Sequence, residues 1–317
     1  MIKDILEKVS FDKYEKEYYE KALVEHNSLS DMNDLEYDIT NDLLKKHLLY
    51  FNYDQYVFKF AKSATDLIKQ LFEKYVDDDT LIVTTDNEHP NVRDILHGYS
   101  NVVYAIQKQH YVPFTVNKKY KRIFIYMIGA YCGSGHIVKN KEFEFVIANA
   151  KAYCDEVISV IDAVQELFLY PRDYHLFDYI IGTGHALIEK YNVGFVLSKR
   201  NDIGINTKAA YTFAYLLDIL LQRRCYLNEF SNLMSEYFTE SYYYKCQSRS
   251  ELNHLFMLES KGNIFDGLIQ EGEILPGVDD QHNGILLRGC WSVVNKEGFL
   301  NKLDIVDFAL ENFKNNQ

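Results

Sequence analysis

Short runs of apolar residues recur through the first two thirds of the chain, and segments with helical periodicity lie between them. Such runs, rich in Val, Ile, Phe and Tyr, are typical of parallel strands that are buried on both faces. Strands that alternate with helices predict an α/β fold with a doubly wound, mainly parallel sheet. The expected strands are residues 80–84, 102–106, 123–127, 157–161 and 179–181, and the expected helices are 63–75, a segment starting near 92, and 143–154.

The two ends of the chain follow a different pattern. Apolar side chains at three- and four-residue spacing predict a helix in residues 1–24 that packs on another surface, and a second helix is expected at 42–49. Beyond residue 200 the expected elements are helices at 207–224 and 230–244, a strand at 284–288 and a terminal helix at 303–313. We therefore expect an N-terminal helical segment (1–50), a large domain (51–200) and a smaller C-terminal α+β domain (201–317).

Polar and ionisable side chains directly follow several of the predicted strands. Asp162 and Gln165 follow one strand, Thr183 and His185 follow the next along the chain, and His89 lies in the turn after the first. Open α/β sheets bind ligands at the carboxyl ends of their strands. The pattern therefore predicts one ligand site at this edge, although each residue alone could be a helix cap or part of a loop salt bridge.

The order of these residues resembles a known family. The Asp-Ala-Val-Gln segment at 162–165, Asp178, the Thr-Gly-His turn at 183–185 and the Gly-Phe-Val segment at 194–196 are similar to motifs of the class V aminotransferase and cysteine desulfurase family. Its members are fold type I enzymes that use pyridoxal 5'-phosphate (PLP). The resemblance implies PLP as the cofactor, an amino acid substrate that reacts through an external aldimine, and a homodimer with the active site at its interface. Aminotransferase, lyase and epimerase chemistry all remain open.

The resemblance implies a role for each residue around the cofactor ring. Asp162 would keep the pyridine nitrogen protonated, which makes the ring an electron sink. Gln165 would hydrogen-bond the phenolic oxygen. His89, in a Glu-His pair, would stack on the ring and pass protons.

Other residues match the family's phosphate ligands. Ala64 and Thr65 lie in a Ser-Ala-Thr-Asp turn similar to the family's phosphate-binding turn, and the same turn could simply start a helix. Thr183 and His185 match two more phosphate ligands. Thr207 matches a threonine that the neighbouring subunit contributes.

Near the C-terminus, Arg288 begins a segment that is similar to the family's Arg-x-Ser segment. The resemblance implies that Arg288 binds the α-carboxylate of the substrate, a task suited to a planar donor with two prongs. The alternative is an ordinary surface salt bridge.

The chain departs from the family at the catalytic position. The residue after His185 is, in the family, the lysine that holds PLP as a Schiff base, and here it is Ala186. Alanine supplies neither the amine nor the base above the substrate Cα, and Lys190 lies beyond the turn. Two explanations stay open. An engineered lysine-to-alanine change is favoured because the neighbouring site residues are retained. The other is a natural pseudoenzyme that binds PLP adducts noncovalently or serves as a partner protein.

Two further departures concern cysteines. Cys132 stands where many family members have an asparagine near the cofactor. Residues 268–287 contain no cysteine, and Cys290 follows Arg288 rather than preceding it. Desulfurase chemistry by the usual persulfide route is therefore not expected.

Composition narrows the class of protein further. A net charge of −12 without a basic tract disfavours binding to nucleic acid. The 5 cysteines are an odd number without a C-x-x-C pair, which indicates free thiols in a reducing compartment and no metal site. The first residues do not form a signal peptide, and no apolar run approaches membrane length. We expect a cytoplasmic protein that does not bind membranes.

Overall fold

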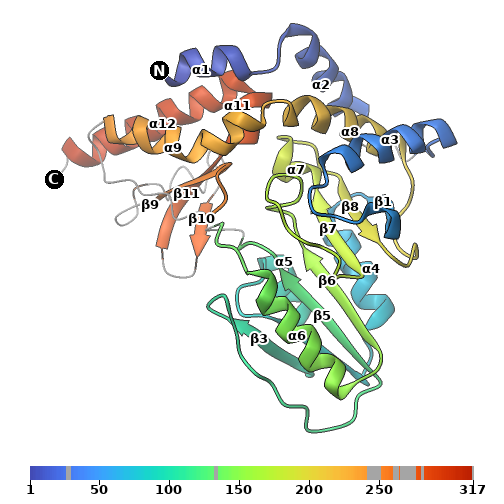
Figure 1. The fold of residues 1–317 in the computed structure, drawn as a ribbon. Coiled ribbons are helices and arrows are strands. Elements are labelled where there is room, and N and C mark those ends of the chain that lie inside the picture. Colours follow the sequence, from blue (N-terminus) through green and yellow to red (C-terminus); the bar gives the residue numbers. More distant parts are fainter. Residues whose placement is uncertain are drawn as a thin grey trace.

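Among the residues that the computed structural model describes (1–25, 30–131, 135–240, 251–259, 264, 276–279 and 282–315), eight strands form the central sheet (Figure 1). Their order is β1-β8-β7-β6-β5-β2-β3-β4. The five strands from β7 to β3 in this order run parallel, and β8, β1 and β4 pair antiparallel with their neighbours. The bounds are β1 (Val57–Ala61), β2 (Thr80–Thr85), β3 (Val102–Gln107), β4 (His110–Tyr111), β5 (Arg122–Ile128), β6 (Val157–Asp162), β7 (Tyr179–Thr183) and β8 (Gly194–Ser198). The predicted doubly wound, mainly parallel sheet is confirmed.

Helices cover both faces of this sheet and form a layer beyond its upper end in the view of Figure 1. No helix in the described part of the chain combines the length and the apolar character needed to cross a membrane. The bounds are α1 (Ile2–Val9), α2 (Lys13–Glu25), α3 (Asp34–His47), α4 (Ala64–Tyr75), α5 (Pro90–Leu96), α6 (Asn140–Tyr153), α7 (Gly184–Leu187), α8 (Lys208–Leu221), α9 (Arg224–Glu240), α11 (Gly289–Val294) and α12 (Lys296–Asn315), with a short 3-10 helix at Tyr53–Gln55.

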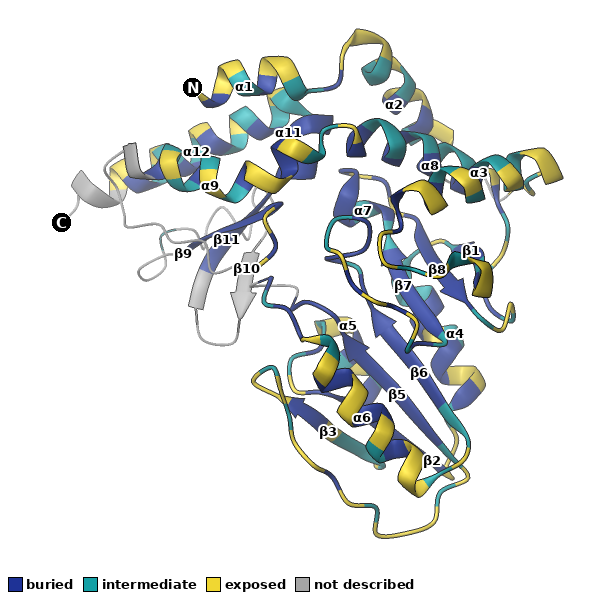
Figure 2. Ribbon diagram, viewed as in Figure 1, coloured by how far each residue is buried: buried dark blue, intermediate teal, exposed yellow. Residues whose placement is uncertain are grey.

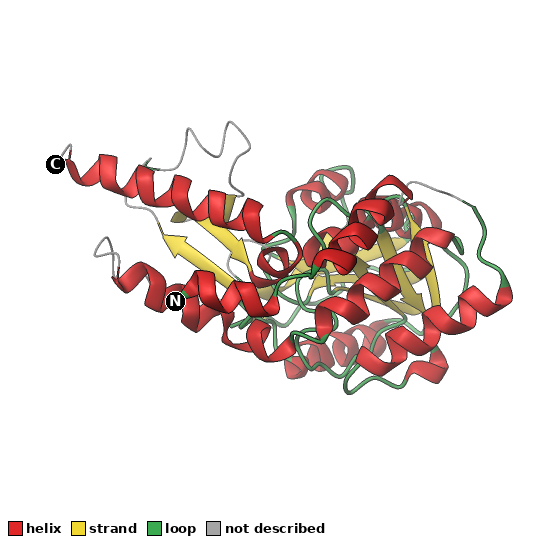
Figure 3. Cartoon of the chain, turned by 90° about the horizontal axis from the view of Figure 1, so that it is seen from above, coloured by secondary structure: helices red, strands yellow, loops and turns green. Residues whose placement is uncertain are grey.

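Side chains alternate between two hydrophobic layers along the central strands. Ile82 and Phe124 lie in one buried cluster with residues of α4 and α5. Val83 and Ile125 lie in the other cluster, with residues of α6 and α8. Because successive side chains of a strand point to opposite faces, continuous apolar runs are what a sheet covered on both faces requires. Figure 2 shows the central strands as buried along nearly their whole length, and Figure 3 shows the helices around them.

A second, smaller sheet lies near the C-terminal end of the chain. It is antiparallel, has the order β10-β11-β9, and packs with α9, α11 and α12 (Figure 1). The strands are β9 (Leu255–Glu259), β10 (Pro276–Asp279) and β11 (His282–Arg288). The α+β character predicted for this region is therefore present, whereas the boundaries at 50 and 200 remain predictions.

Several element bounds differ from the expected ones for local reasons. The N-terminal region is two helices, because the chain turns after Ser10 and Phe11 donates its backbone N–H to the carbonyl of Val293. The next helix starts at Asp34, well before residue 42, because Asn33 and Glu36 form a capping box. The helices expected at 230 and 303 start earlier, at Arg224 and Lys296, and the edge strand β1 was not predicted.

The strand order reverses between β2 and β5. From β2 the chain moves outward to β3, then returns to β5 and continues in the opposite direction through β6 and β7. At such a switch point the loops that leave the carboxyl ends of neighbouring strands diverge, which opens a crevice for a ligand. The turns after β2, β6 and β7 therefore face one region of this edge.

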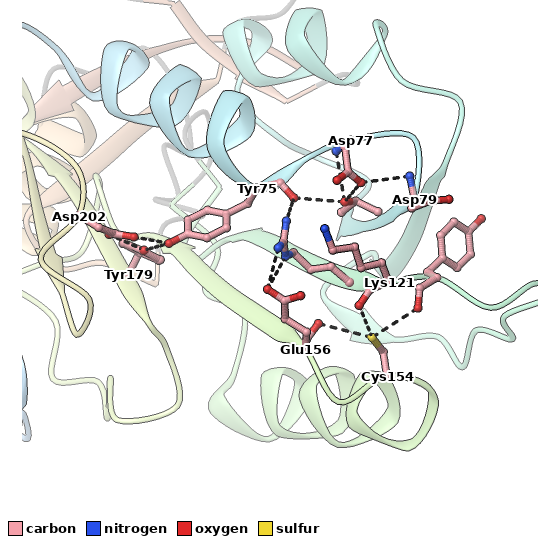
Figure 4. A network of polar contacts seen from close by, with 11 residues as sticks. Tyr75, Asp77, Asp79, Lys121, Cys154, Glu156, Tyr179 and Asp202 are labelled. Carbon is pink, nitrogen blue, oxygen red and sulfur yellow. Dashed lines mark hydrogen bonds and ion pairs between the residues drawn. The ribbon is translucent and has the colours of Figure 1, made fainter.

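The opposite edge of the sheet holds a polar network that contains none of the predicted site residues (Figure 4). The hydroxyl of Tyr179 donates to Asp202 at 2.7 Å, and the hydroxyl of Tyr75 bonds to both of these residues. Arg122 donates to Glu156 at 2.8 Å and to the backbone carbonyl of Tyr75 at 2.9 Å. These contacts tie the amino ends of β5 and β7 to the end of α4, so this network stabilises the fold.

Candidate functional site

The carboxyl edge of the sheet brings together most of the residues that the sequence singles out. Each comes from the end of a different element, and β11 adds one residue from the C-terminal region. They are Ala64 and Thr65 after β1, His89 after β2, Asp162 and Gln165 after β6, Thr183, His185 and Ala186 after β7, and Arg288 at the end of β11.

Asp162 is a buried carboxylate at the last position of β6, with 5% of its surface exposed. Its Oδ2 accepts a hydrogen bond from the Tyr126 hydroxyl at 2.9 Å, and its Oδ1 accepts one from the backbone N–H of Val164 at 3.1 Å. Burial raises the pKa of Asp162, while these two donors and the nearby imidazole of His89 act to lower it. A cationic partner would therefore stabilise the ionised form of this buried acid.

Backbone groups and hydroxyls meet where α4 starts. Ser63 caps this helix, since its hydroxyl accepts from the backbone N–H of Asp66 at 3.1 Å. Gly194 lies against this start, because a Cβ on it would be 2.1 Å from the backbone carbon of Ser63 and 2.4 Å from the backbone nitrogen of Ala64. Thr183 pairs with Gly194 across the β7–β8 ladder. The sequence thus places Thr183 beside the amino end of a twelve-residue helix, where backbone N–H groups favour an anion.

His89 lies at the start of α5, next to the same region. Its Nδ1 accepts from the backbone N–H of Asn91 at 3.2 Å, so the ring proton belongs on Nε2. The Asn91 side chain donates in turn to the hydroxyl of Thr65 at 3.3 Å. The turn after β2 is therefore joined to the turn after β1, and His89 lies close enough to Asp162 to act on its pKa.

His185 and Ala186 lie in α7, the single turn that follows β7. The His185 backbone carbonyl accepts from Trp291 Nε1 at 3.0 Å, and the two rings meet edge to face with centroids 5.1 Å apart. Its Nδ1 is buried and has no hydrogen-bond partner within the described residues. Burial, and then Arg288, lower the pKa of His185, so the ring is neutral at pH 7. Ala186 is 5% exposed.

Arg288 reaches this edge from the C-terminal region. Its Nη1 donates to the Gln165 side-chain oxygen at 2.7 Å, and its guanidinium lies 5.5 Å from the centroid of the Trp291 ring. The imidazole Nε2 of His254 is 3.0 Å from the Gln165 backbone carbonyl, and burial lowers the pKa of His254 to about 3. Arg288 is 7% exposed and is not a surface salt bridge of the kind considered as an alternative.

The remaining candidates lie elsewhere or are inert. Thr207 caps α8, where its hydroxyl accepts from the backbone N–H of Ala209 at 3.2 Å, and it is 3% exposed in this chain. Its contribution to a neighbouring subunit remains a prediction. Cys290 is fully buried, and burial raises the pKa of its thiol to about 12, so it is not a nucleophile. Cys132 lies outside the described residues.

Three buried polar residues beside the site were not predicted from the sequence. Tyr126 reads as an ordinary strand residue, yet its hydroxyl bonds to Asp162. Glu166 and Arg172 form an ion pair, 0% and 2% exposed, with 2.7 Å between Nη2 and Oε2. Arg172 also donates to the carbonyls of Gly129 and Val138, so it fastens the segment that follows β6 to the one that follows β5. In the sequence, only the position of the charged Glu166 directly after Gln165 points to this pair.

Comparison with known proteins establishes the fold. No protein-family model matches the sequence, and no curated protein sequence matches it. A NifS-like protein structure matches with a TM-score of 0.64 and 15% identity over 95% of this chain and 96% of that chain. A NifS-like protein from Rickettsia africae ESF-5 matches with a TM-score of 0.64 and 14% identity over 94% of this chain and 96% of that chain.

A third match is serine palmitoyltransferase from S. paucimobilis, in a form that has alanine in place of one lysine and carries a PLP-myriocin aldimine. The TM-score is 0.59 and the identity 12%, over 95% of this chain and 84% of that chain. At such identities the likeness concerns architecture. The chain has the fold of the fold type I PLP-dependent transferases, with a doubly wound, mainly parallel sheet and a smaller C-terminal α+β region.

Proposed function

We propose that this chain binds PLP at the carboxyl edge of its central sheet and belongs functionally with PLP-dependent enzymes that act on amino acids. The observation that carries the proposal is the meeting of an acid for a ring nitrogen, Asp162, with a helix start and hydroxyls for a phosphate, around Thr65 and Thr183. The buried Nδ1 of His185, which has no hydrogen-bond partner in the described part of the chain, adds one more group for a ligand. Bound PLP would supply an electron sink for an amino acid's Cα electrons.

Each residue has a task that its present contacts support. Asp162 would hold the pyridine nitrogen, and the Tyr126 hydroxyl fixes the carboxylate for that contact. Thr65, Thr183 and His185 would bind the phosphate together with the backbone of Ala64.

The ring and the substrate would be held by three other residues. His89 would cover the face of the ring. Arg288 holds the side-chain oxygen of Gln165, so the amide N–H₂ is the end that would donate to an oxygen acceptor such as a phenolate. Arg288 would bind the substrate carboxylate.

Ala186 decides which steps the chain can complete. An alanine cannot form a covalent bond to PLP and cannot move a proton at the substrate Cα. We propose that the natural enzyme has lysine at this position. The alanine in this chain would then be an engineered replacement. The serine palmitoyltransferase form in which alanine replaces a lysine and which carries a PLP adduct shows that such a variant of the same fold can hold an adduct.

Binding of pyridoxine 5'-phosphate tests the proposal without covalent chemistry, because this ligand has no aldehyde. Trp291 is the 1 tryptophan of the chain and touches His185, so its fluorescence should change saturably on binding. Thr183→Ala should weaken binding by about tenfold, the value of roughly one lost hydrogen bond to a charged group. Thr212→Ala is the matched control, because the Thr212 hydroxyl donates to the Lys208 backbone carbonyl within α8 and was not assigned to the site. An unchanged fluorescence at saturating ligand would contradict the proposal.

The second candidate function is a natural pseudoenzyme that binds PLP adducts noncovalently or acts as a partner protein. The presence of alanine at position 186 favours this candidate, because Ala186 is buried, with 5% exposure, in a site where the other predicted residues are present. Residue 186 in the natural gene separates the two candidates: lysine supports the enzyme and alanine supports the pseudoenzyme.

We also propose that the chain forms a homodimer, as the resemblance to fold type I enzymes implies. The proposal concerns Thr207 directly, since its assigned task lies in a neighbouring subunit. Sedimentation equilibrium at micromolar concentration should give twice the chain mass of 37.2 kDa, and a monomer would contradict the proposal.

A further inference from the structure

Glu88 is a buried acidic residue in the wall of the candidate site. It lies in the turn between β2 and α5, directly before His89, and is 1% exposed. The strand order reverses beside this turn, so the Glu88 carboxyl group lies at the edge where the site residues gather. The groups that contact it are hydroxyls and backbone N–H groups rather than cations.

The two carboxyl oxygens of Glu88 have different surroundings. Oε1 accepts from the hydroxyls of Thr84 at 3.1 Å and Thr85 at 2.6 Å, and from the backbone N–H groups of Thr85 at 3.3 Å and Ile128 at 3.2 Å. Oε2 is buried and has no hydrogen-bond partner within the described residues. In the neutral form of Glu88, the oxygen that accepts these donors must be the carbonyl oxygen. A proton on Glu88 therefore belongs on Oε2.

The charges around Glu88 also favour the neutral form. Asp162 is a second buried carboxyl group within electrostatic range, and two such groups without a cation between them do not both ionise readily. The phenols of Tyr126 and Tyr131 face the same region, and the pKa of both is raised chiefly by burial and to a smaller extent by Glu88 and other nearby carboxyl groups. His89 is the neighbouring imidazole, and it acts to lower the pKa of Asp162. Burial, opposed in part by the Thr85 hydrogen bond, raises the pKa of Glu88 to about 8.

We propose that Glu88 is a protonated acid that donates a hydrogen bond from Oε2 to an acceptor atom of the ligand bound at this edge. A buried O–H donor without an acceptor is costly, and a ligand acceptor would remove that cost. The inference deepens the proposed function and rests on it, because it assigns a further binding residue to the same site. It also states what Glu88 selects for, namely a ligand with a hydrogen-bond acceptor, not a cation, at that point.

The test uses the full chain, pyridoxine 5'-phosphate and Glu88→Gln. Glutamine keeps an oxygen for the four donors and places an N–H₂ where Oε2 lies, so it mimics the neutral acid at every pH. Affinity is measured by calorimetry at pH 6.5 and pH 9. Ionisation of the ligand affects both proteins equally, so the ratio of their affinities reports the pH dependence that Glu88 adds, directly or through its neighbour Asp162.

We expect similar affinities at pH 6.5 and about tenfold weaker binding by the unmodified chain at pH 9, because roughly nine tenths of Glu88 is then ionised and has lost its donor. Parallel pH profiles, with both proteins binding, would overturn the Glu88 assignment and leave the proposed function standing. No binding by either protein would instead contradict the proposed function, and the donor role with it.

A second measurement needs no ligand. The infrared difference spectrum between the unmodified chain and Glu88→Gln should contain a protonated carboxyl band at pH 6.5 that vanishes at pH 9. A carboxylate signal at pH 6.5 in its place would overturn the assignment even if ligand binding behaved as expected.

Discussion

Arg288 donates a 2.7 Å hydrogen bond from Nη1 to the side-chain oxygen of Gln165, although the two residues are 123 positions apart. The contact links the end of β11 to the turn after β6, so it joins the C-terminal region to the central sheet. It also sets the orientation of the Gln165 amide, whose oxygen faces Arg288 and whose N–H₂ group we propose as a donor to the ligand. One arginine can therefore affect both halves of the proposed ligand, the cofactor ring and the amino acid.

Arg288→Lys should weaken binding of a reduced PLP–amino acid conjugate by about tenfold to a hundredfold. Lysine keeps the positive charge but offers no two-pronged planar donor for a carboxylate. Pyridoxine 5'-phosphate, which has no amino acid part, should lose much less affinity, and calorimetry with both ligands measures the difference. Equal losses for the two ligands would show that Arg288 acts only through Gln165.

Asp162→Asn should lower the affinity for pyridoxine 5'-phosphate by about tenfold to a hundredfold, since a hydrogen bond to a charged group contributes roughly 1.5–3 kcal/mol. Asp178→Asn is the matched control. Asp178 is also a strand-end aspartate, but it lies at the amino end of β7, where it accepts from the backbone N–H of Ser159 at 2.9 Å. Fluorescence titration through Trp291 measures both variants, and equal effects would remove Asp162 from the site.

The fold followed from the sequence more fully than the site did. Apolar runs such as the one in β6 predict buried strands because a sheet covered on both faces needs apolar residues throughout. The strand β1 was not predicted because it lies at the sheet edge. Its side chains alternate there between buried and partly exposed, so it lacks a continuous apolar run. The early start of α3 depended on a capping box at Asn33, which carries the helix through polar residues that lack apolar periodicity.

At the site, strand ends and family order predicted which residues meet, but not the contacts among them. Asp162 was predicted, whereas its donor Tyr126 looks like any apolar strand position until the sheet register places β5 beside β6. The Gln165–Arg288 contact joins residues 123 positions apart and leaves no local pattern. Asp178 illustrates the opposite case: it matches the family order, yet its hydrogen bonds are those of a structural residue far from the site.

Arg172→Met should destabilise the fold by about 3–5 kcal/mol, because it leaves the buried carboxylate of Glu166 without its cation. The double variant Arg172→Met with Glu166→Gln should recover part of this loss, since no buried charge then remains. Urea unfolding followed by circular dichroism measures both. Lys16→Met is the matched control, because Lys16 and Glu297 form an ion pair at the surface. A single variant as stable as this control would contradict the role of the pair.

The contribution of Glu88 to stability should fall as the pH rises from about 5 to 8. Its pKa is raised from 4.5 to about 8, so over this range the folded chain keeps a proton that the unfolded chain has lost. The stability advantage is complete below the unfolded pKa and is lost as the pH passes through the folded one. The free energy of unfolding should therefore decrease by about 1.4 kcal/mol per pH unit from this group. Asp162, whose pKa is also raised by burial, acts in the same direction.

Glu88→Gln isolates that contribution, because glutamine does not titrate. Urea unfolding at pH 5.5, 6.5 and 7.5 should show the unmodified chain losing stability relative to the variant at each step. A constant difference between the two proteins over this range would mean that Glu88 is ionised throughout.

We propose that this edge of the sheet is a PLP site that lacks only an amine at position 186. Ala186→Lys mixed with PLP should develop the visible absorbance of a protonated Schiff base, and borohydride reduction should fix the cofactor to residue 186 in a peptide map. The unmodified chain, which retains its other lysines, is the control and should show no such band. If Ala186→Lys folds but stays without the band at saturating PLP, this edge of the sheet is not a PLP site.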